Sequence, residues 1–134
     1  MIQPKRQLRL ALVAHDAKKA EMVDWAGRHI DTLRSARLFA TGTTGSQITQ
    51  HYSNLELTAL KSGPLGGDQQ LGAMICEGQL DALIFFIDPL SPLPHDVDVK
   101  ALNRLAVVYD LPLANSPSTA DFILRGLAGD EHGA

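Results

Sequence analysis

The chain has 134 residues, with 45% apolar and 20% charged side chains and a formal net charge of −3. This length suits a single domain over residues 1–134, and this composition is typical of a folded protein and not of a disordered one. Aromatic residues make up only 5% of the chain, and the sequence has no long basic cluster. Because nucleic-acid binding needs a basic surface or aromatic stacking platforms, we expect no nucleic-acid partner.

Membrane insertion and secretion are not expected either. The longest apolar run, Ala82–Ile87, is far shorter than the roughly 20 residues that cross a bilayer. The basic N-terminus is not followed by an apolar signal core. The single cysteine, Cys76, excludes an internal disulfide and a cysteine metal cluster, so we expect a cytoplasmic protein.

Hydrophobic patterning predicts five strands that alternate with helices. In chain order the strands are Leu10–Ala14, Arg37–Ala40, Leu55–Leu60, Ala82–Ile87 and Leu113–Ala114. Since these strands are mostly continuous apolar runs, they fit a parallel sheet that is covered on both faces. The predicted fold is a single doubly wound α/β domain with a five-stranded, mostly parallel sheet and helices on both faces.

The helices are predicted from apolar residues that repeat with a period of about 3.6 residues. The first has its apolar face on Met22, Trp25, Ala26, Ile30 and Leu33, and a short one covers Ser46–Tyr52. The next carries Leu71, Met74 and Ile75 and ends near Gly78, and another carries Val99, Leu102, Leu105, Ala106 and Tyr109. Residues Ser118–Asp121 have a capping-box pattern that predicts the start of the last helix.

Polar segments follow the predicted strands at their carboxyl ends, where ligands bind in this class of fold. The glycines and hydroxyls of Thr41–Gly45, placed before a helix, suit a phosphate. This segment is neither a Walker A loop nor a G-x-G-x-x-G turn, so it does not indicate hydrolysis of a nucleoside triphosphate. Lys19 is a candidate cation for the same anion. The alternatives are a capped strand-to-helix turn at Thr41–Gly45 and a solvated lysine at position 19.

The segment Ser62–Asp68 is a more specific signal. Pro64 stiffens a glycine-rich loop that places the Asp68 carboxylate at the start of a helix. Taken alone, Asp68 is explained as an N-cap. An N-cap does not need Gly66 and Gly67 directly before it, so these glycines indicate that the backbone closely approaches another group.

Histidine–aspartate pairs occur in two of these segments. His15 and Asp16 follow the first strand, while His95 and Asp96 lie in the loop after the fourth strand, beyond Asp88. A single histidine in such a place is more often structural than catalytic, but two pairs at matching strand ends favour a shared site. No H-x-H or H-E-x-x-H spacing occurs, so we expect no metal.

Several segments resemble those of methylglyoxal synthases, in the same order and over nearly the whole chain. They are Leu12–Asp16, Ala40–Gly45, Ser62–Gln70, Phe86–Leu90, Pro94–Leu102 and Thr119–Ile123. The run Gly-Gly-Asp-Gln-Gln at 66–70 with a downstream Pro-His-Asp at 94–96 is specific to the synthases. Related regulatory domains of the same fold, such as the one that closes carbamoyl-phosphate synthetase, lack this pairing.

The resemblance implies an enzyme that converts dihydroxyacetone phosphate into methylglyoxal and inorganic phosphate, with no metal or organic cofactor. It further implies a homo-oligomer, usually a hexamer. Asp68 matches the family's catalytic carboxylate and His95 its catalytic histidine, while Asp16 and Asp98 match further carboxylates of the catalytic pocket. The positions that match substrate and phosphate binding are His15, Lys19, Thr41, Gly42, Thr43, Thr44, Ser62 and Gly63.

These groups suit a reaction through an enediol. Asp68 would remove a proton from the hydroxyl-bearing carbon, His95 would donate to the developing oxygen anion, and Asp16 or Asp98 would orient a histidine. The phosphate cradle would then hold the leaving group and would also bind free phosphate as an inhibitor. Two alternatives stay open: a non-catalytic phosphate- or nucleotide-binding regulatory module of the same fold, and an isomerase that shares the enediol step.

Overall fold

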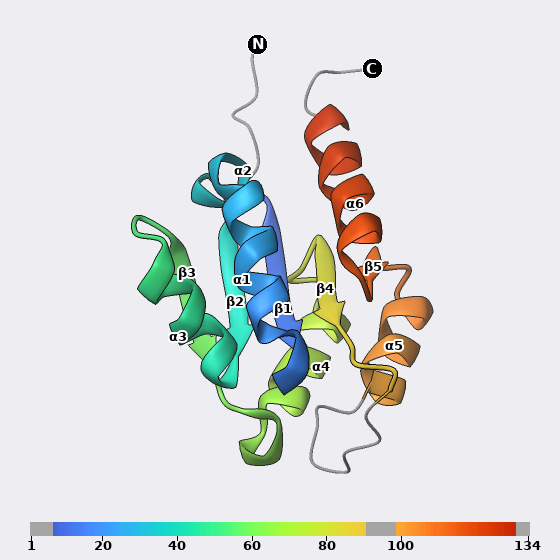
Figure 1. Ribbon diagram of the computed structural model, residues 1–134. Coiled ribbons are helices and arrows are strands. Elements are labelled where there is room, and N and C mark those ends of the chain that lie inside the picture. The colour runs from blue at the N-terminus through green and yellow to red at the C-terminus, as the bar shows by residue number, and fades with distance from the viewer. Residues whose placement is uncertain (1–6, 91–98, 131–134) are drawn as a thin grey trace.

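The sheet of this protein is entirely parallel. The computed structural model describes residues 7–90 and 99–130. Five strands lie in the order β3-β2-β1-β4-β5, and each neighbouring pair is parallel. The strands are β1 Arg9–Ala14, β2 Arg37–Thr41, β3 Glu56–Leu60, β4 Ala82–Phe86 and β5 Leu113–Ala114. The predicted doubly wound α/β domain is confirmed (Figure 1).

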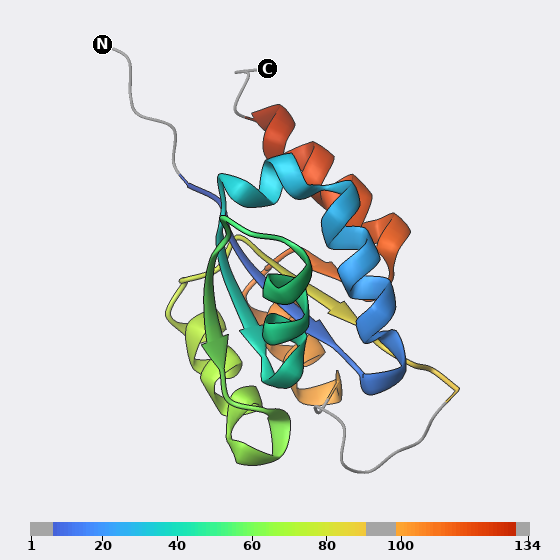
Figure 2. The same ribbon diagram turned by 60° about the vertical axis from the view of Figure 1, so that its left-hand side comes forward.

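Helices cover both faces of this sheet. They are α1 Lys19–Arg28, α2 Ile30–Arg34, α3 Gly42–His51, α4 Gly67–Cys76, α5 Val99–Val108 and α6 Pro117–Asp130, with short 3-10 turns η1 Asp16–Lys18 and η2 Gly63–Leu65. Figures 1 and 2 show α1, α3 and α6 on one face and α4 and α5 on the other. The direction of each strand-to-helix crossover therefore sets which face its helix covers.

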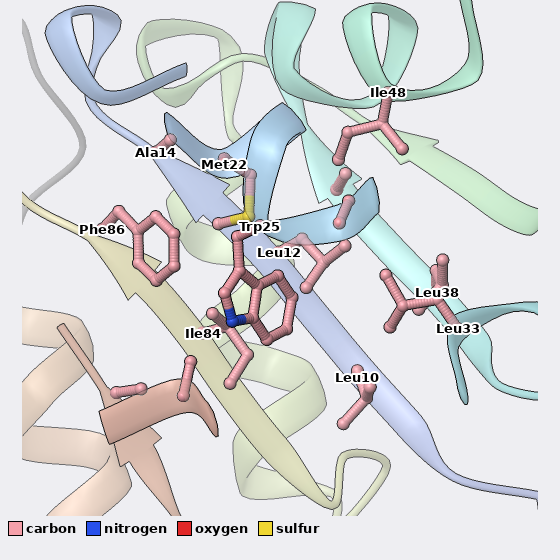
Figure 3. Packing of buried hydrophobic residues seen from close by; sticks show 14 of the residues in the cluster. Leu10, Leu12, Ala14, Met22, Trp25, Leu33, Leu38, Ile48, Ile84 and Phe86 are labelled. Carbon is pink, nitrogen blue, oxygen red and sulfur yellow. The ribbon is translucent and has the colours of Figure 1, made fainter. Parts of the chain in front are cut away.

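The central strand β1 supplies both hydrophobic cores in alternation. Leu10 and Leu12 point into the larger core, where they pack with the fully buried Trp25 of α1 (Figure 3). Ala11 and Val13 point to the opposite face, into the core beneath α4 and α5. Because side chains alternate across a strand, a continuous apolar run is what a strand buried on both faces requires.

The sheet has a switch point between β1 and β4. The connection from β1 leads through α1 to β2 on one side, whereas β4 lies on the other side of β1 and continues to β5. At the carboxyl ends of these two strands the amide of His15 donates to the carbonyl of Phe86 at 3.1 Å. Crevices that bind ligands form where the connections diverge in this way.

Two predicted helix boundaries differ from the structure. Helix α3 begins at Gly42 and not at Ser46, so most of the expected glycine–threonine loop is the first turn of the helix. The first predicted helix is divided at His29, whose φ of −115° and ψ of 24° separate α1 from α2. The expected apolar face is retained, with Met22 and Leu33 buried on either side of the break.

The predicted capping box before the last helix is wrong. Helix α6 begins at Pro117, so Ser118 lies inside its first turn. The Asp121 carboxylate instead accepts hydrogen bonds that join α6 to α1: Trp25 Nε1 lies 2.9 Å and His29 Nε2 2.6 Å from its Oδ1. Asp121 therefore stabilises the packing of two helices and does not cap its own.

Candidate active site

His15 is held at the switch point by the chain after β4. Its side chain is buried, and the backbone amide of Asp88 donates to its Nδ1 at 2.9 Å. Its ring also meets the edge of Phe85, with the ring centroids 5.3 Å apart. Because Nδ1 accepts a hydrogen bond, the neutral ring carries its proton on Nε2 and presents a donor there.

Lys19 joins the turn after β1 to the turn after β2. As the first residue of α1, it extends its ammonium to Thr43 Oγ1 at 2.6 Å and to Asp16 Oδ1 at 2.8 Å. The hydrogen bond and the charge of Lys19 lower the pKa of Asp16 below its ordinary value of 3.8, although partial burial acts in the opposite direction. Asp16 stays ionised at neutral pH and fixes the cation beside the threonine.

The first turn of α3 presents buried hydroxyls beside free helix amides. Thr41 closes β2 and is buried, and Gly42 follows with φ +52°, a conformation that favours glycine. Thr44 is 1% exposed, and among the residues that the structure describes no group forms a hydrogen bond with its Oγ1. A helix N-terminus with amides, a hydroxyl and a nearby ammonium suits an anion.

The turns after β2 and β3 touch each other. A Cβ added to Gly42 would lie 3.4 Å from the Cβ of Ser62. Since Thr41 pairs with Leu60 in the sheet, the two chains leave the same edge side by side. Ser62 and Gly63 therefore lie next to the first turn of α3.

Asp68 occupies the second position of α4 and is half-buried. The N-cap of this helix is Gly66, with φ +109°, so the explanation of Asp68 as an N-cap does not hold. The next residue, Gly67, has no room for a side chain, because an added Cβ would overlap the carbonyl oxygen of Lys61. The close approach that the paired glycines indicate is thus made with the chain's own backbone, and it packs the start of α4 against the residues that follow β3.

The remaining predicted site residues cannot be placed. His95, Asp96 and Asp98 lie outside the described residues, which end at Leu90 and resume at Val99. Every predicted site residue that is described ends or follows a strand at the carboxyl edge of the sheet, which is the lower edge in Figure 1. The expected common edge is confirmed for this part of the set.

Sequence reasoning missed two hydrogen bonds beside the predicted site residues. The first is the hydrogen bond from the backbone amide of Asp88 to His15. Because every residue except proline has such an amide, the residue type at position 88 does not reveal it. The second is the hydrogen bond that the side chain of Gln70 accepts from the amide of Lys61 at 2.7 Å. The sequence shows His15 after a strand and Gln70 in a glycine-rich segment. The groups that bond to these two side chains can be identified only from the fold.

Within residues 7–90 and 99–130, no three histidine, cysteine, aspartate or glutamate side chains gather closely enough to hold a metal ion. Over the same residues, no helix combines the length and the apolar character that a membrane span requires. The predicted site residues that are described at this edge supply an ammonium, hydroxyls, a helix N-terminus, a histidine and a carboxylate. Such a set can hold an anion and move a proton beside it.

Comparison with known proteins identifies the family. A family model described as an MGS-like domain matches residues 21–115. A methylglyoxal synthase of Rhizobium rhizogenes is 56% identical over 118 residues, which cover 88% of this chain and 94% of the relative. One of Oleidesulfovibrio alaskensis is 54% identical over 120 residues, covering 90% of this chain and 82% of that protein.

A solved structure agrees with this result. The crystal structure of methylglyoxal synthase from Elizabethkingia anophelis NUHP1 matches with a TM-score of 0.83 and 51% sequence identity, over 88% of this chain and 77% of that one. This chain therefore belongs to the methylglyoxal synthase family.

Proposed function

We propose that this protein is a carbon–oxygen lyase that converts dihydroxyacetone phosphate into methylglyoxal and inorganic phosphate. The observation that carries the proposal is the position of Lys19, whose ammonium binds Thr43 at the first turn of α3. This places a cation and a helix N-terminus where a phosphate monoester would be held. The names of the relatives support the same reaction.

The first step is proton removal. Asp68 takes a proton from the hydroxyl-bearing carbon, and the electrons of the broken C–H bond form an enediolate whose negative charge lies on the former carbonyl oxygen. A donor beside that oxygen lowers the barrier. The neutral ring of His15 carries its proton on Nε2, and His95, which lies outside the described residues, remains the predicted catalytic histidine.

The second step is elimination. A proton from the donor converts the enediolate oxygen into the hydroxyl of the enediol. As the terminal hydroxyl of the enediol then loses its proton to the departing phosphate, its electrons form an aldehyde, the carbon–carbon double bond shifts, and the carbon–oxygen bond to phosphate breaks. The product is the enol of methylglyoxal, which becomes the ketone by protonation at carbon. No electron acceptor is needed, since the electron pair leaves with the phosphate.

Holding the phosphate decides between a lyase and an isomerase. Elimination requires the breaking carbon–oxygen bond to stand across the plane of the enediol, so that its antibonding orbital overlaps the double bond. We assign this orientation to Thr41, Gly42, Thr43 and Thr44, together with Ser62-Gly63 and Lys19. The same groups would bind free phosphate, so we expect phosphate to compete with the substrate.

A non-catalytic phosphate-binding module of the same fold is the second candidate function. It needs the first turn of α3 and Lys19 but has no use for a carboxylate held beside the anion. Asp68, at the second position of α4 and not acting as its cap, favours the enzyme. Asp16 and Asp98 are assigned to supporting roles, Asp16 through its ion pair with Lys19.

The assembly proposed is a homo-oligomer, of hexameric size by family resemblance, in the cytoplasm. Exposed apolar side chains on α5 and α6 suit such an assembly: Val107 is 77%, Val108 63% and Phe122 68% exposed. Light scattering on the purified full chain gives the number of subunits. A monomer at micromolar concentration would refute this assembly.

The activity is tested by incubating the full chain with dihydroxyacetone phosphate in the presence of a metal chelator. Inorganic phosphate and the dicarbonyl product are measured in parallel. We expect equal amounts of both and inhibition by added phosphate. Phosphate binding without dicarbonyl formation would favour the regulatory module, and formation of glyceraldehyde 3-phosphate would favour the isomerase.

A further inference from the structure

A glutamine side chain closes the loop that carries the proposed base. The chain leaves β3 at Leu60 and turns through η2, and α4 then begins against the backbone that has just left the strand. The amide of Lys61 donates to Gln70 Oε1 at 2.7 Å, and the amide of Gly67 donates to the carbonyl of Ser62 at 2.9 Å. The acceptor of the first hydrogen bond is a side chain, and the acceptor of the second is the backbone.

We propose that Gln70 is a positioning residue, which fixes Asp68 relative to the phosphate subsite at Ser62-Gly63. This inference rests on the proposed function, because it assigns a role within the same reaction. Gln70 stands two positions after Asp68 in the first turns of α4, and its partner Lys61 directly precedes Ser62. A single hydrogen bond therefore links the segment that presents the base to the segment that presents the phosphate ligands.

The loop needs such a link because glycines give it freedom. Gly66 and Gly67 lie between the subsite at Ser62-Gly63 and the base, and Gly66 has φ +109° with nothing within 4 Å of an added Cβ. Glycines allow more backbone conformations than other residues do. The backbone bond from Gly67 to Ser62 restrains the middle of the loop, and the Gln70 bond restrains the entrance at Lys61.

The helix itself does not depend on the side chain of Gln70. Its backbone amide donates to the carbonyl of Gly66 at 3.0 Å, and any residue other than proline at position 70 retains that bond. The side-chain bond to Lys61 is exposed, so water can replace it when the side chain is shortened. Its loss should therefore loosen the geometry of the site without unfolding the protein.

Proton abstraction is sensitive to such loosening. The base must approach the proton within a near-attack distance, and an error of about 1 Å can reduce the rate about a hundredfold. Phosphate affinity depends more on Lys19 and the first turn of α3, which belong to other elements. A positioning role for Gln70 therefore predicts a loss in kcat that exceeds any loss in phosphate binding.

The test compares three variants of the full chain. Gln70→Ala removes the acceptor, Gln70→Glu keeps a side-chain oxygen that can accept from Lys61, and Gln69→Ala shortens a neighbouring exposed glutamine. We expect kcat to fall about tenfold to a hundredfold in Gln70→Ala, with the phosphate inhibition constant changed by less than about threefold. Gln70→Glu should recover most of kcat, and Gln69→Ala should match the parent.

Hydrogen exchange gives a readout that does not need activity. We expect the amide of Lys61 to exchange at least about tenfold faster in Gln70→Ala than in the parent and to be protected again in Gln70→Glu. The proposal is overturned if kcat of Gln70→Ala stays within twofold of the parent, if Gln70→Glu is no better than Gln70→Ala, or if Lys61 exchange is unchanged. An inactive parent chain would refute the proposed function, whereas an active parent with an unimpaired Gln70→Ala would refute this inference alone.

Discussion

The backbone amide of Asp88 donates to His15 Nδ1 at 2.9 Å and so ties the end of β4 to the end of β1. This bond crosses the switch point of the sheet, between strands that are neighbours although they lie far apart in the sequence. It leaves Nε2 as the ring atom that carries the proton.

The first prediction concerns this tautomer. In uniformly ¹⁵N-labelled protein, long-range proton–nitrogen spectra distinguish the two ring nitrogens of a histidine. We expect the neutral form of His15 to carry its proton on Nε2, because the Asp88 amide occupies Nδ1. A neutral ring protonated on Nδ1 would show that this hydrogen bond is absent in solution.

Replacement of Lys19 by methionine tests the anion site. The ammonium that contacts Thr43 would be lost while most of the side-chain volume remains. A hydrogen bond to a charged group contributes about 1.5–3 kcal/mol, so KM for the substrate and the phosphate inhibition constant should rise roughly tenfold to a hundredfold.

Lys18→Met is the matched control for that variant. Lys18 lies one residue earlier, and its ammonium forms an ion pair with the carboxylate of Glu21 at 3.7 Å. Glu21 is not one of the predicted site residues. We expect its kinetic constants to stay within about twofold of the parent, since exposed ion pairs contribute little. Equal effects at both lysines would mean that Lys19 acts only through the general charge of the surface.

Gly67→Ala and Gly126→Ala should change stability in opposite directions. A methyl group at position 67 would overlap the carbonyl oxygen of Lys61, so the backbone must shift, and we expect a loss of about 1–3 kcal/mol in the free energy of unfolding. At position 126, inside α6, an added Cβ meets no described atom within 4 Å other than its chain neighbours and the helix's own nearby backbone. Higher helix propensity should there add about 0.5–1 kcal/mol. Denaturant unfolding measures both values, and a stable Gly67→Ala would contradict the close approach.

Asp121→Ala tests the contact between α6 and α1. Trp25 is fully buried, and its Nε1 donor would lose the acceptor that now lies 2.9 Å away. An unsatisfied buried donor costs about 1–3 kcal/mol, so we expect a loss of that size in the free energy of unfolding at pH 7. Asp24→Ala, on the exposed face of α1, is the control and should change it by less than about 0.5 kcal/mol.

The contribution of Asp121 should also depend on pH. Burial alone would raise the pKa of this carboxyl, but hydrogen bonds from His29 and Trp25, with the charges of His29 and Arg28, lower the pKa below its ordinary value of 3.8. The stabilisation by the ionised group is therefore complete above the ordinary pKa and is lost as the pH falls through the lower folded value. The stability difference between the parent and Asp121→Ala should narrow on acidification below about pH 4. A difference that widens there would contradict this sign.

The sheet could be predicted from sequence because its strands carry strong local signals. The run Ala82–Phe86 is buried on both faces, and Gly78, with φ +68°, ends α4 as expected, with the amide of Gln79 bonded to the carbonyl of Met74. The start of α3 was missed because glycines and threonines favour loops by propensity. In the fold, the pairing of Thr41 with Leu60 continues to the strand end and leaves the following residues to begin the helix.

Interactions between distant segments could not be predicted in this way. Asp121 fits a capping pattern by its neighbours, but its partners Trp25 and His29 lie more than ninety positions away in the sequence. The same holds for His15 and Asp88, which meet only because β1 and β4 pair. Residue types predicted the strand ends at which these polar groups lie, whereas the fold alone determines which atoms touch.

The most direct test of the proposed chemistry is the turnover of Asp68→Asn. This change keeps the size and the position of the side chain on α4 but removes its ability to take a proton. Loss of a general base typically lowers kcat by about 10²–10⁴-fold, and we expect a loss in that range with phosphate binding and thermal unfolding close to those of the parent. A variant that releases methylglyoxal and phosphate at a near-normal rate would show that Asp68 is not the base.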